Sequence, residues 1–276
     1  MTDAILGLDA VTKTFGHGSA TVHAARAISF SLHAGRALAL VGESGSGKTT
    51  CARMAMREYL PTSGRILYKG RPVEAAKSAE IARYRRSVQM IFQDPFASLN
   101  PAHTIAHHLR RPLQLHRPEV KGTEIDAAIR ELLQRVNIAR ALAVKPEVIV
   151  ADEPTSMLDV SVRLGVLNLL NEMKREMNLG LLYITHDIAT ARYVAEDIAV
   201  MYAGQIVEWG SVAKVIDNPL HPYTRLLLSA VPDPDVRFDD PKARLRPDEV
   251  EDIRRRSAVP QDDIVELEED HFMRMI

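Results

Sequence analysis

The sequence is poor in cysteine, in net charge and in long apolar runs, and each shortage narrows the possible functions. Its single cysteine, Cys51, can form neither an internal disulfide nor a cysteine-based metal cage, which fits a reducing cytosol and a buried apolar thiol. The formal net charge is -1, so the chain has no overall basic field with which to bind phosphate backbones. We therefore expect no nucleic-acid partner.

No apolar run approaches the roughly 20 residues that a membrane-spanning helix needs. The N-terminal segment carries Asp3 and Asp9 and lacks a basic stretch followed by an apolar one, so we expect no signal peptide. A role at a membrane would therefore require docking on partners that cross it. The chain has 276 residues, of which 46% are hydrophobic, and this is enough for a sizeable buried core.

Short β-type segments, turns and helical stretches follow one another along most of the chain, which predicts an α/β fold. The N-terminal segments predict a small antiparallel sheet that leads into a parallel one. Strands that alternate with helices further along predict right-handed crossovers in that parallel sheet. The expected strands are residues 4–8, 21–24, 28–32, 37–41, 66–68, 88–92, 148–151, 181–185, 198–202 and 206–209, and the expected helices are residues 49–60 and 161–177.

Two regions depart from this alternation. Residues 94–142 contain Pro101, Pro112 and Pro118 followed by a helical pattern, which predicts a mostly helical insertion within a domain of residues 1–231. Residues 232–276 are dense in charged residues and proline, which predicts a solvated C-terminal tail with one short helix that starts near Pro247.

A glycine-rich segment at residues 42–49 follows an apolar strand and opens a helix, which is the context of a P-loop. Its glycines allow backbone N–H groups to face phosphate oxygens, and the helix N-terminus adds a favourable dipole potential. Lys48 would contact the β- and γ-phosphates of ATP, and the Thr49 hydroxyl can ligate Mg²⁺. The alternative, a structural glycine turn, is disfavoured by this context. The expected nucleotide-binding residues here are Gly42, Glu43, Ser44, Gly45, Ser46, Gly47, Lys48, Thr49 and Thr50.

An acidic pair, Asp152 and Glu153, follows the apolar run at residues 148–151. Such a run predicts a central parallel strand, whose carboxyl end presents side chains at the ligand-binding edge of the sheet. Asp152 would hold Mg²⁺, and Glu153 would polarise the water that attacks the γ-phosphate. An acidic pair alone is more often a simple turn, but together with the P-loop it indicates the second half of a nucleotide site.

With both motifs, residues 6–231 resemble the ATP-binding-cassette family. The resemblance implies an α/β P-loop NTPase cassette with a mixed parallel sheet, an N-terminal antiparallel β subdomain and a helical subdomain, which is shortened in this chain. It also implies that Phe15 stacks on adenine and that Gln93 reaches Mg²⁺ and the attacking water. His186 would contact the γ-phosphate, to which a neutral imidazole can donate a hydrogen bond. Ser156 and Asp159 would belong to the D-loop, which communicates across a dimer of cassettes.

Residues 93–101 and 218–227 resemble the oligopeptide, dipeptide and nickel importer group, which also includes sugar and opine transporters. The resemblance implies an ATPase subunit at the cytoplasmic face of the inner membrane, with peptide as the first candidate cargo. Its partners would be two membrane permeases, an extracytoplasmic substrate-binding protein and a second ATPase subunit, either a paralogue or another copy. The C-terminal tail has no cysteine, so we expect no iron–sulfur centre of the kind that some members carry.

The family's signature motif, Leu-Ser-Gly-Gly-Gln, is absent, because no Gly-Gly pair occurs between Gln93 and Asp152. Residues 131–136 resemble the end of one family helix and residues 137–143 the later part of the signature helix, so the segment between them is missing. In this family each ATP lies between the P-loop of one subunit and the signature of the other. We therefore expect poor hydrolysis by a homodimer and one competent site in a heterodimer with an intact paralogue.

Two alternatives belong to other functional classes. One is a module that binds ATP and docks on the permease without turnover. The other is a soluble relative that acts on ribosomes or DNA, but such proteins carry paired cassettes or long coiled-coil insertions, and this chain has neither.

Overall fold

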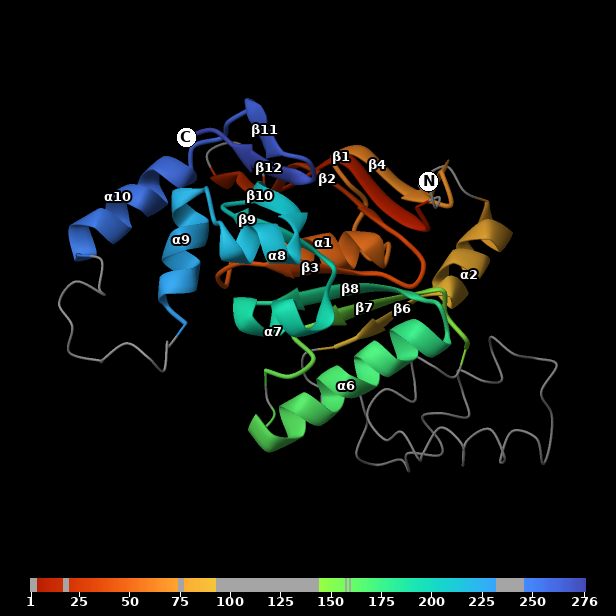
Figure 1. The fold of residues 1–276 in the computed structure, drawn as a ribbon. Helices are drawn as coiled ribbons and strands as arrows, with labels where there is room; N and C mark the ends of the chain where they lie inside the picture. The colour runs from red at the N-terminus through yellow and green to blue at the C-terminus, as the bar shows by residue number, and fades with distance from the viewer. Residues whose placement is uncertain are drawn as a thin grey trace, which may run out of the picture.

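The computed structural model describes residues 4–16, 20–73, 77–92, 144–156, 158, 160–231 and 246–276 (Figure 1). The strands among them are β1 (Leu6–Phe15), β2 (Val22–Leu32), β3 (Ala37–Val41), β4 (Ser63–Tyr68), β5 (Arg71–Pro72), β6 (Val88–Ile91), β7 (Val148–Asp152), β8 (Gly180–Thr185), β9 (Asp197–Tyr202), β10 (Gln205–Ser211), β11 (Ile264–Glu268) and β12 (His271–Arg274). The helices are α1 (Lys48–Ala55), α2 (Ser78–Ser87), α6 (Val160–Glu176), α7 (Ile188–Val194), α8 (Val212–Asp217), α9 (Pro222–Ser229) and α10 (Pro247–Ser257).

These strands form two sheets. The smaller sheet is antiparallel, in the order β2-β1-β4-β5, and the larger one is mixed, in the order β11-β12-β10-β9-β3-β8-β7-β6. The middle of the larger sheet, from β9 to β6, is parallel throughout. The α/β fold with an antiparallel N-terminal sheet and a parallel centre is therefore confirmed.

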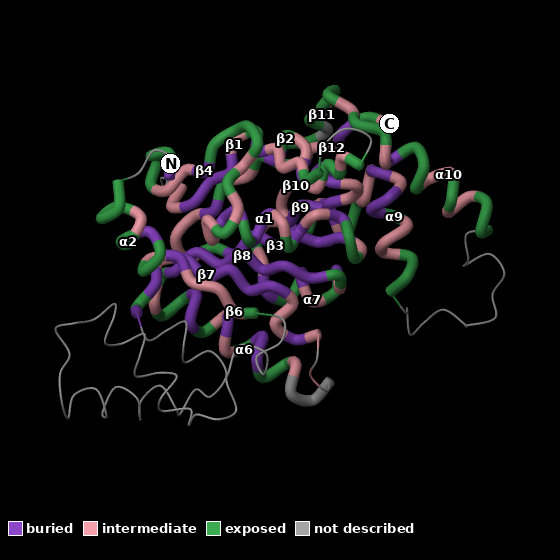
Figure 2. The backbone as a smooth tube through the Cα atoms, turned by 180° about the vertical axis from the view of Figure 1, so that it is seen from behind, coloured by how far each residue is buried: buried purple, intermediate pink, exposed green. Residues whose placement is uncertain are grey.

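The larger sheet is covered on both faces, which explains why β3, β7 and β8 are buried at every position. Alternate residues of β3 enter two separate cores: Leu40 packs with α1 and the antiparallel sheet, while Ala39 packs with α6 and α7. The buried backbone runs through the centre of the molecule, and α2 and α10 lie exposed at opposite ends (Figure 2). The central strands are thus fixed from both sides, and their carboxyl ends are held in one register.

Most expected central strands agree with the structure within one or two residues, but several local expectations are wrong. The two strands expected at 21–24 and 28–32 are one strand, β2 (Val22–Leu32), with an irregularity near Ala27, whose φ of 46° is left-handed. The helix expected over residues 49–60 ends at Ala55, because Arg57 adopts a φ of 56° that no α-helix accommodates. The first strand, β1, continues to Phe15 instead of ending at residue 8, and the helices α2, α7, α8 and α9 were not expected from the pattern.

The expectation of a solvated tail is also wrong for residues 246–276. The helix α10 begins at Pro247 as expected, but β12 pairs with β10 and extends the larger sheet, and β11 pairs with β12. The buried positions of β12 are His271 and Arg274, both polar. A strand that buries polar side chains gives no alternation of apolar residues, so hydrophobic patterning could not reveal it.

The shortened helical insertion expected at residues 94–142 lies outside the described residues. Within the described ranges, none of the helices is both long and apolar enough to pass through a bilayer.

Candidate nucleotide site

The glycine-rich loop connects β3 to α1, and its curl depends on two glycines. Gly47 has a φ of 106°, and a Cβ atom there would lie 2.1 Å from the carbonyl oxygen of Ala24. A Cβ atom on Gly42 would lie 2.1 Å from the carbonyl oxygen of Met201. Both contacts are with backbone atoms, which cannot give way as a flexible side chain could. Glycine is therefore required where the loop passes β2 and β9.

Lys48 is buried in this loop with its ammonium group turned back onto the backbone. Its Nζ atom donates hydrogen bonds of 2.7 Å to the carbonyl oxygens of Gly42 and of Glu43. Burial lowers the pKa of Lys48, although the carboxylates of Glu153, Asp152 and Glu43 oppose that effect. The loop thus holds a desolvated cation at its centre, where phosphate oxygens could replace the carbonyl groups as its partners.

Asp152 ends β7 and is only 4% exposed, opposite the start of α1. The Thr49 hydroxyl donates to Oδ1 of Asp152 at 3.5 Å. Burial raises the pKa of Asp152, because the ionised carboxylate has lost much of its solvation. A carboxylate and a hydroxyl are hard oxygen ligands of the type that Mg²⁺ prefers. The two residues therefore fit a magnesium ion shared with phosphate oxygens.

Glu153 follows Asp152 with a left-handed backbone, at a φ of 46°. A hydrogen bond of 2.9 Å from its N–H to the carbonyl oxygen of Ile184 fixes this turn beside β8. The turn directs the Glu153 carboxylate toward His186, whose Nδ1 atom lies 3.2 Å from Oε1. Backbone strain of this kind is found mainly at functional sites.

A cavity of about 1080 Å³ is lined by Lys48, Thr49, Glu153 and His186 among others, and its volume lies just above the usual range for small-molecule sites. One wall is the P-loop, another is the edge formed by Glu153 and His186, and a third comes from β2 with Val22 and Arg26. The C-terminal part of the chain adds Ala258 and residues of α9. The predicted residues that line it are Glu43, Ser44, Gly45, Gly47, Lys48, Thr49, Thr50, Glu153 and His186. Gly42 and Ser46 belong to the loop and Asp152 contacts Thr49, although none of the three lines the cavity.

The remaining four predicted residues have a different position or none. Phe15 is not among the residues that line the cavity; its ring meets Tyr59 edge-on with centroids 5.4 Å apart, so its adenine role stays a prediction. The Ser156 hydroxyl donates to the Glu153 carbonyl at 3.0 Å, and its role across a dimer is likewise untested. Gln93 and Asp159 lie outside the described residues.

Sequence reasoning missed the residues that β2 and the C-terminal region bring to the site, including Arg26, Tyr223 and Arg254. Arg26 lines the cavity from β2. Tyr223 and Arg254 both contact Glu43 of the P-loop, from α9 and α10. The segment that contains Tyr223 carried a subtype resemblance but no hint of a position, and neither arginine belongs to a motif. Only their place in the fold identifies them.

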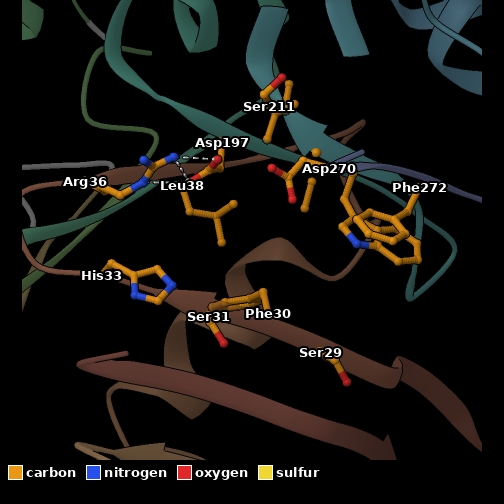
Figure 3. A pocket seen from close by; sticks show the side chains of 14 residues that line it. Ser29, Phe30, Ser31, His33, Arg36, Leu38, Asp197, Ser211, Asp270 and Phe272 are labelled. Carbon is orange, nitrogen blue, oxygen red and sulfur yellow. Dashed lines mark hydrogen bonds and ion pairs between the residues drawn. The ribbon is translucent and has the colours of Figure 1, made fainter. Parts of the chain in front are cut away.

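A second cavity of about 410 Å³ lies between β2 and the strands β3, β9, β10 and β12 of the larger sheet (Figure 3). Its polar groups include Arg36, whose guanidinium donates to both carboxylate oxygens of Asp197 at 2.9 Å. Trp209 and Phe272 stack at one side, with ring planes 10° apart. No residue predicted for the nucleotide site lines this cavity, so it is a separate feature.

Comparison with sequence families gives two matches. A family described as "ABC transporter" matches residues 25–156, and one described as "Oligopeptide/dipeptide transporter, C-terminal region" matches residues 207–258. The oligopeptide transport ATP-binding protein OppF of Bacillus subtilis is 39% identical over 271 residues, which cover 90% of this chain and 89% of OppF. A putative peptide import ATP-binding protein of Brucella abortus is 39% identical over 252 residues, covering 84% of this chain and 80% of that protein.

Solved structures resemble the fold as well. The dimeric ATP-binding cassette MJ0796, bound to ADP and phosphate, has a TM-score of 0.68 at 26% identity and covers 75% of this chain and 98% of that one. CbiO1 of Clostridium perfringens, part of the transporter complex cbiONQ, has a TM-score of 0.69 at 25% identity and covers 78% and 92%.

The P-loop, the acidic pair opposite it and the two sheets define the class as a P-loop ATPase. The chain belongs to the ATP-binding-cassette transporter family and carries the C-terminal region of its oligopeptide branch. The alignment with OppF is 271 residues long, but 90% of this 276-residue chain is only about 248 residues. The alignment therefore contains gaps in the sequence of this chain.

Proposed function

We propose that this chain binds MgATP in the cavity beside its P-loop and hydrolyses it as the energy-supplying subunit of a peptide importer. The observation that carries the proposal is that Lys48, at the start of α1, and Glu153, just after β7, line one cavity. Asp152 lies beside them and contacts Thr49, which also lines the cavity. Peptide as cargo is supported by the names of the relatives from B. subtilis and B. abortus. The permeases and the binding protein of such an importer are the partners, and the chain works at the membrane surface through them.

Binding would proceed by exchange of hydrogen-bond partners. The Lys48 ammonium leaves the carbonyl oxygens of Gly42 and Glu43 for phosphate oxygens, while the N–H groups at the start of α1 face the same phosphates. Thr49 and Asp152 would hold Mg²⁺, which when bound supplies positive charge to the β- and γ-phosphates. The bound cation would stabilise the ionised carboxylate of Asp152, which burial otherwise disfavours.

In the hydrolytic step the oxygen of a water molecule forms a bond to the γ-phosphorus, and the bond from that phosphorus to the β,γ-bridging oxygen breaks. ADP leaves with the electron pair, and Glu153 accepts the proton of the attacking water or orients it. His186 holds the Glu153 carboxylate from the neighbouring strand. Phe15, Gln93, Ser156 and Asp159 keep the roles that the family resemblance implies for adenine, the metal and the dimer.

The absent signature motif makes this site dependent on a partner. The chain has its own P-loop, but no Gly-Gly pair lies between Gln93 and Asp152, so it has no signature to offer a second subunit. Productive closure therefore takes place in a heterodimer, where a partner's signature completes this chain's site.

The experiment uses a second form of this chain, in which the signature segment of B. subtilis OppF is inserted after Val136 and Glu153 is changed to Gln. Neither this form nor the unmodified chain should hydrolyse ATP at more than a trace rate alone, while their mixture should show steady turnover. Turnover by the unmodified chain alone would contradict the need for a partner. A further form carries the inserted signature and keeps Glu153. If all forms bind ATP but neither the mixture nor this further form hydrolyses it, the chain is instead a module that binds ATP without turnover.

A further inference from the structure

The C-terminal region of the chain lies against the P-loop in this structure. The helices α9 and α10 pack together at the end of the molecule opposite α2 (Figure 1). Both reach the same loop residue, Glu43, and Ala258 just after α10 lines the nucleotide cavity. Residues far apart in sequence thus build one side of the site.

Tyr223 in α9 holds the backbone of this loop residue. Its ring is fully buried against Tyr202, with ring centroids 4.2 Å apart. Its Oη atom accepts a hydrogen bond of 3.1 Å from the N–H of Glu43. The first part of the loop is therefore fixed by α9, and this N–H is already engaged in the structure.

Arg254 in α10 holds the side chain of the same residue. Its guanidinium lies 2.7 Å from Oε1 of Glu43, with side chains that are 47% and 35% exposed. Glu43 lines the nucleotide cavity, so its carboxylate would repel a triphosphate unless its charge were compensated. Arg254 supplies that compensation without itself lining the cavity.

The arginine is held in place independently of this ion pair. Gln205 of β10 donates to the carbonyl oxygens of Ser257 and Val259, at 2.9 and 3.1 Å. These bonds anchor the C-terminal end of α10, and Ser257 is fully buried there. Loss of the Arg254 charge would therefore leave the helix docked.

We propose that Arg254 is a positioning residue of the nucleotide site, which neutralises and orients Glu43 so that the C-terminal region sets the affinity for ATP. The proposal rests on the proposed function, because it requires the triphosphate of ATP to occupy the P-loop. It assigns to the oligopeptide-type C-terminal region a direct effect on the nucleotide. The effect is larger for ATP than for ADP, because ATP carries one more negative charge near Glu43.

The test is equilibrium binding of ATP and ADP, with Mg²⁺, to the full chain by calorimetry. For Arg254→Gln we expect the Kd for ATP to rise about 3- to 10-fold, the range of a partly exposed ion pair, and the Kd for ADP to rise less. Glu43→Gln removes the charge that repels ATP, so Arg254 should no longer matter in that background. The Kd for ATP of the double variant Glu43→Gln, Arg254→Gln should therefore lie within about twofold of the Kd of Glu43→Gln alone. Arg254→Lys should retain most of the affinity.

Arg255→Gln is the matched control, because Arg255 lies on the same helix and pairs with Asp252 away from the loop. It should leave both affinities unchanged, and thermal unfolding without nucleotide should be alike in all variants. An equal loss of affinity for Arg254→Gln with and without Glu43→Gln would overturn the proposal, because the arginine would then act by another route. An unchanged Kd in Arg254→Gln would overturn it as well.

Lys48→Ala separates this proposal from the one on which it rests. If Lys48→Ala abolishes ATP binding and Arg254→Gln has no effect, only the role of Arg254 fails. If ATP affinity is the same in Lys48→Ala as in the unmodified chain, the nucleotide site itself is wrong.

Discussion

Glu153 and His186 follow adjacent strands, β7 and β8, and their side chains meet with 3.2 Å between Oε1 and Nδ1. An ionised carboxylate can only accept a hydrogen bond, so Nδ1 must be the donor. A neutral imidazole in this arrangement has no proton on Nε2 and cannot also donate to a γ-phosphate. A neutral His186 would therefore have to release Glu153 before it donates to a γ-phosphate, and that contact stays a prediction.

The first prediction concerns Glu153→Gln. The amide keeps the size of the side chain but cannot take a proton from water, so turnover should fall about 10²- to 10⁴-fold. The affinity for ATP should stay within a few-fold of the original value. The measurement is ATPase activity of the heterodimer with a signature-bearing subunit, together with calorimetric ATP binding. A parallel loss of binding would mean that Glu153 supports the structure and does not act in the chemical step.

The second prediction concerns Asp152→Asn. The pKa of Asp152 is raised by burial, so its ionised form destabilises the folded state of the nucleotide-free protein at neutral pH. The variant should be more stable to unfolding by about 1 to 3 kcal/mol at pH 7. The advantage should shrink as the pH falls, because the folded wild-type protein then takes up a proton more readily than the unfolded chain.

Chemical unfolding of both proteins at several pH values measures this difference. Magnesium dependence of ATP binding in the same two proteins provides the functional arm, and the variant should lose most of it. If Asp152→Asn lowers the free energy of unfolding at pH 7, the ionised Asp152 carboxylate does not destabilise the folded protein and the prediction is wrong.

The third prediction compares two glycines. Gly47→Ala places a Cβ atom against the Ala24 carbonyl oxygen at a φ of 106°, so the loop must distort and ATP binding should be lost. Gly165→Ala is the matched control within α6, where the new Cβ atom would meet no heavy atom within 4 Å apart from its chain neighbours and the backbone of its own helix. It should stabilise the protein by about 0.5 to 1 kcal/mol, the usual gain from alanine in a helix. ATP binding that survives Gly47→Ala would show that the loop adapts.

The fourth prediction concerns His221, which caps α9 by accepting from the Tyr223 N–H through Nδ1. Burial lowers the pKa of His221 from its usual value of 6.5 to about 4. Between pH 6.5 and 4 this histidine is therefore protonated in the unfolded chain but not in the folded one. The free energy of unfolding should fall as the pH drops through this range. The carboxylate of Glu208 and the ring of His271 belong to the same buried cluster.

His221→Asn isolates this contribution, because asparagine can also cap a helix but does not titrate. The variant should lose stability at pH 8, where the missing ring leaves a cavity, yet its unfolding free energy should depend less on pH between 6.5 and 4. An equally steep dependence in both proteins would assign the acid sensitivity to other groups.

Much of the fold followed from local patterns. The apolar runs at residues 37–41 and 148–151 predicted central strands because strands covered on both faces need apolar residues at every position. The prediction failed where the side chains that pack inward are polar, as in β12 with His271 and Arg274. It also failed at Arg57, whose left-handed backbone ends α1 early although nothing in the pattern stops the helix.

The sequence by itself determined the loop at residues 42–49 and the acidic pair after β7, because these groups act through neighbours in the chain. A phosphate is held by consecutive amides, and a carboxylate is presented by the strand that precedes it. Only the tertiary structure decided that Arg254 and Tyr223 contact Glu43. Arg254 is 211 positions from Glu43 along the chain. The two residues meet because of the way α9 and α10 pack in the fold, which no local sequence preference determines.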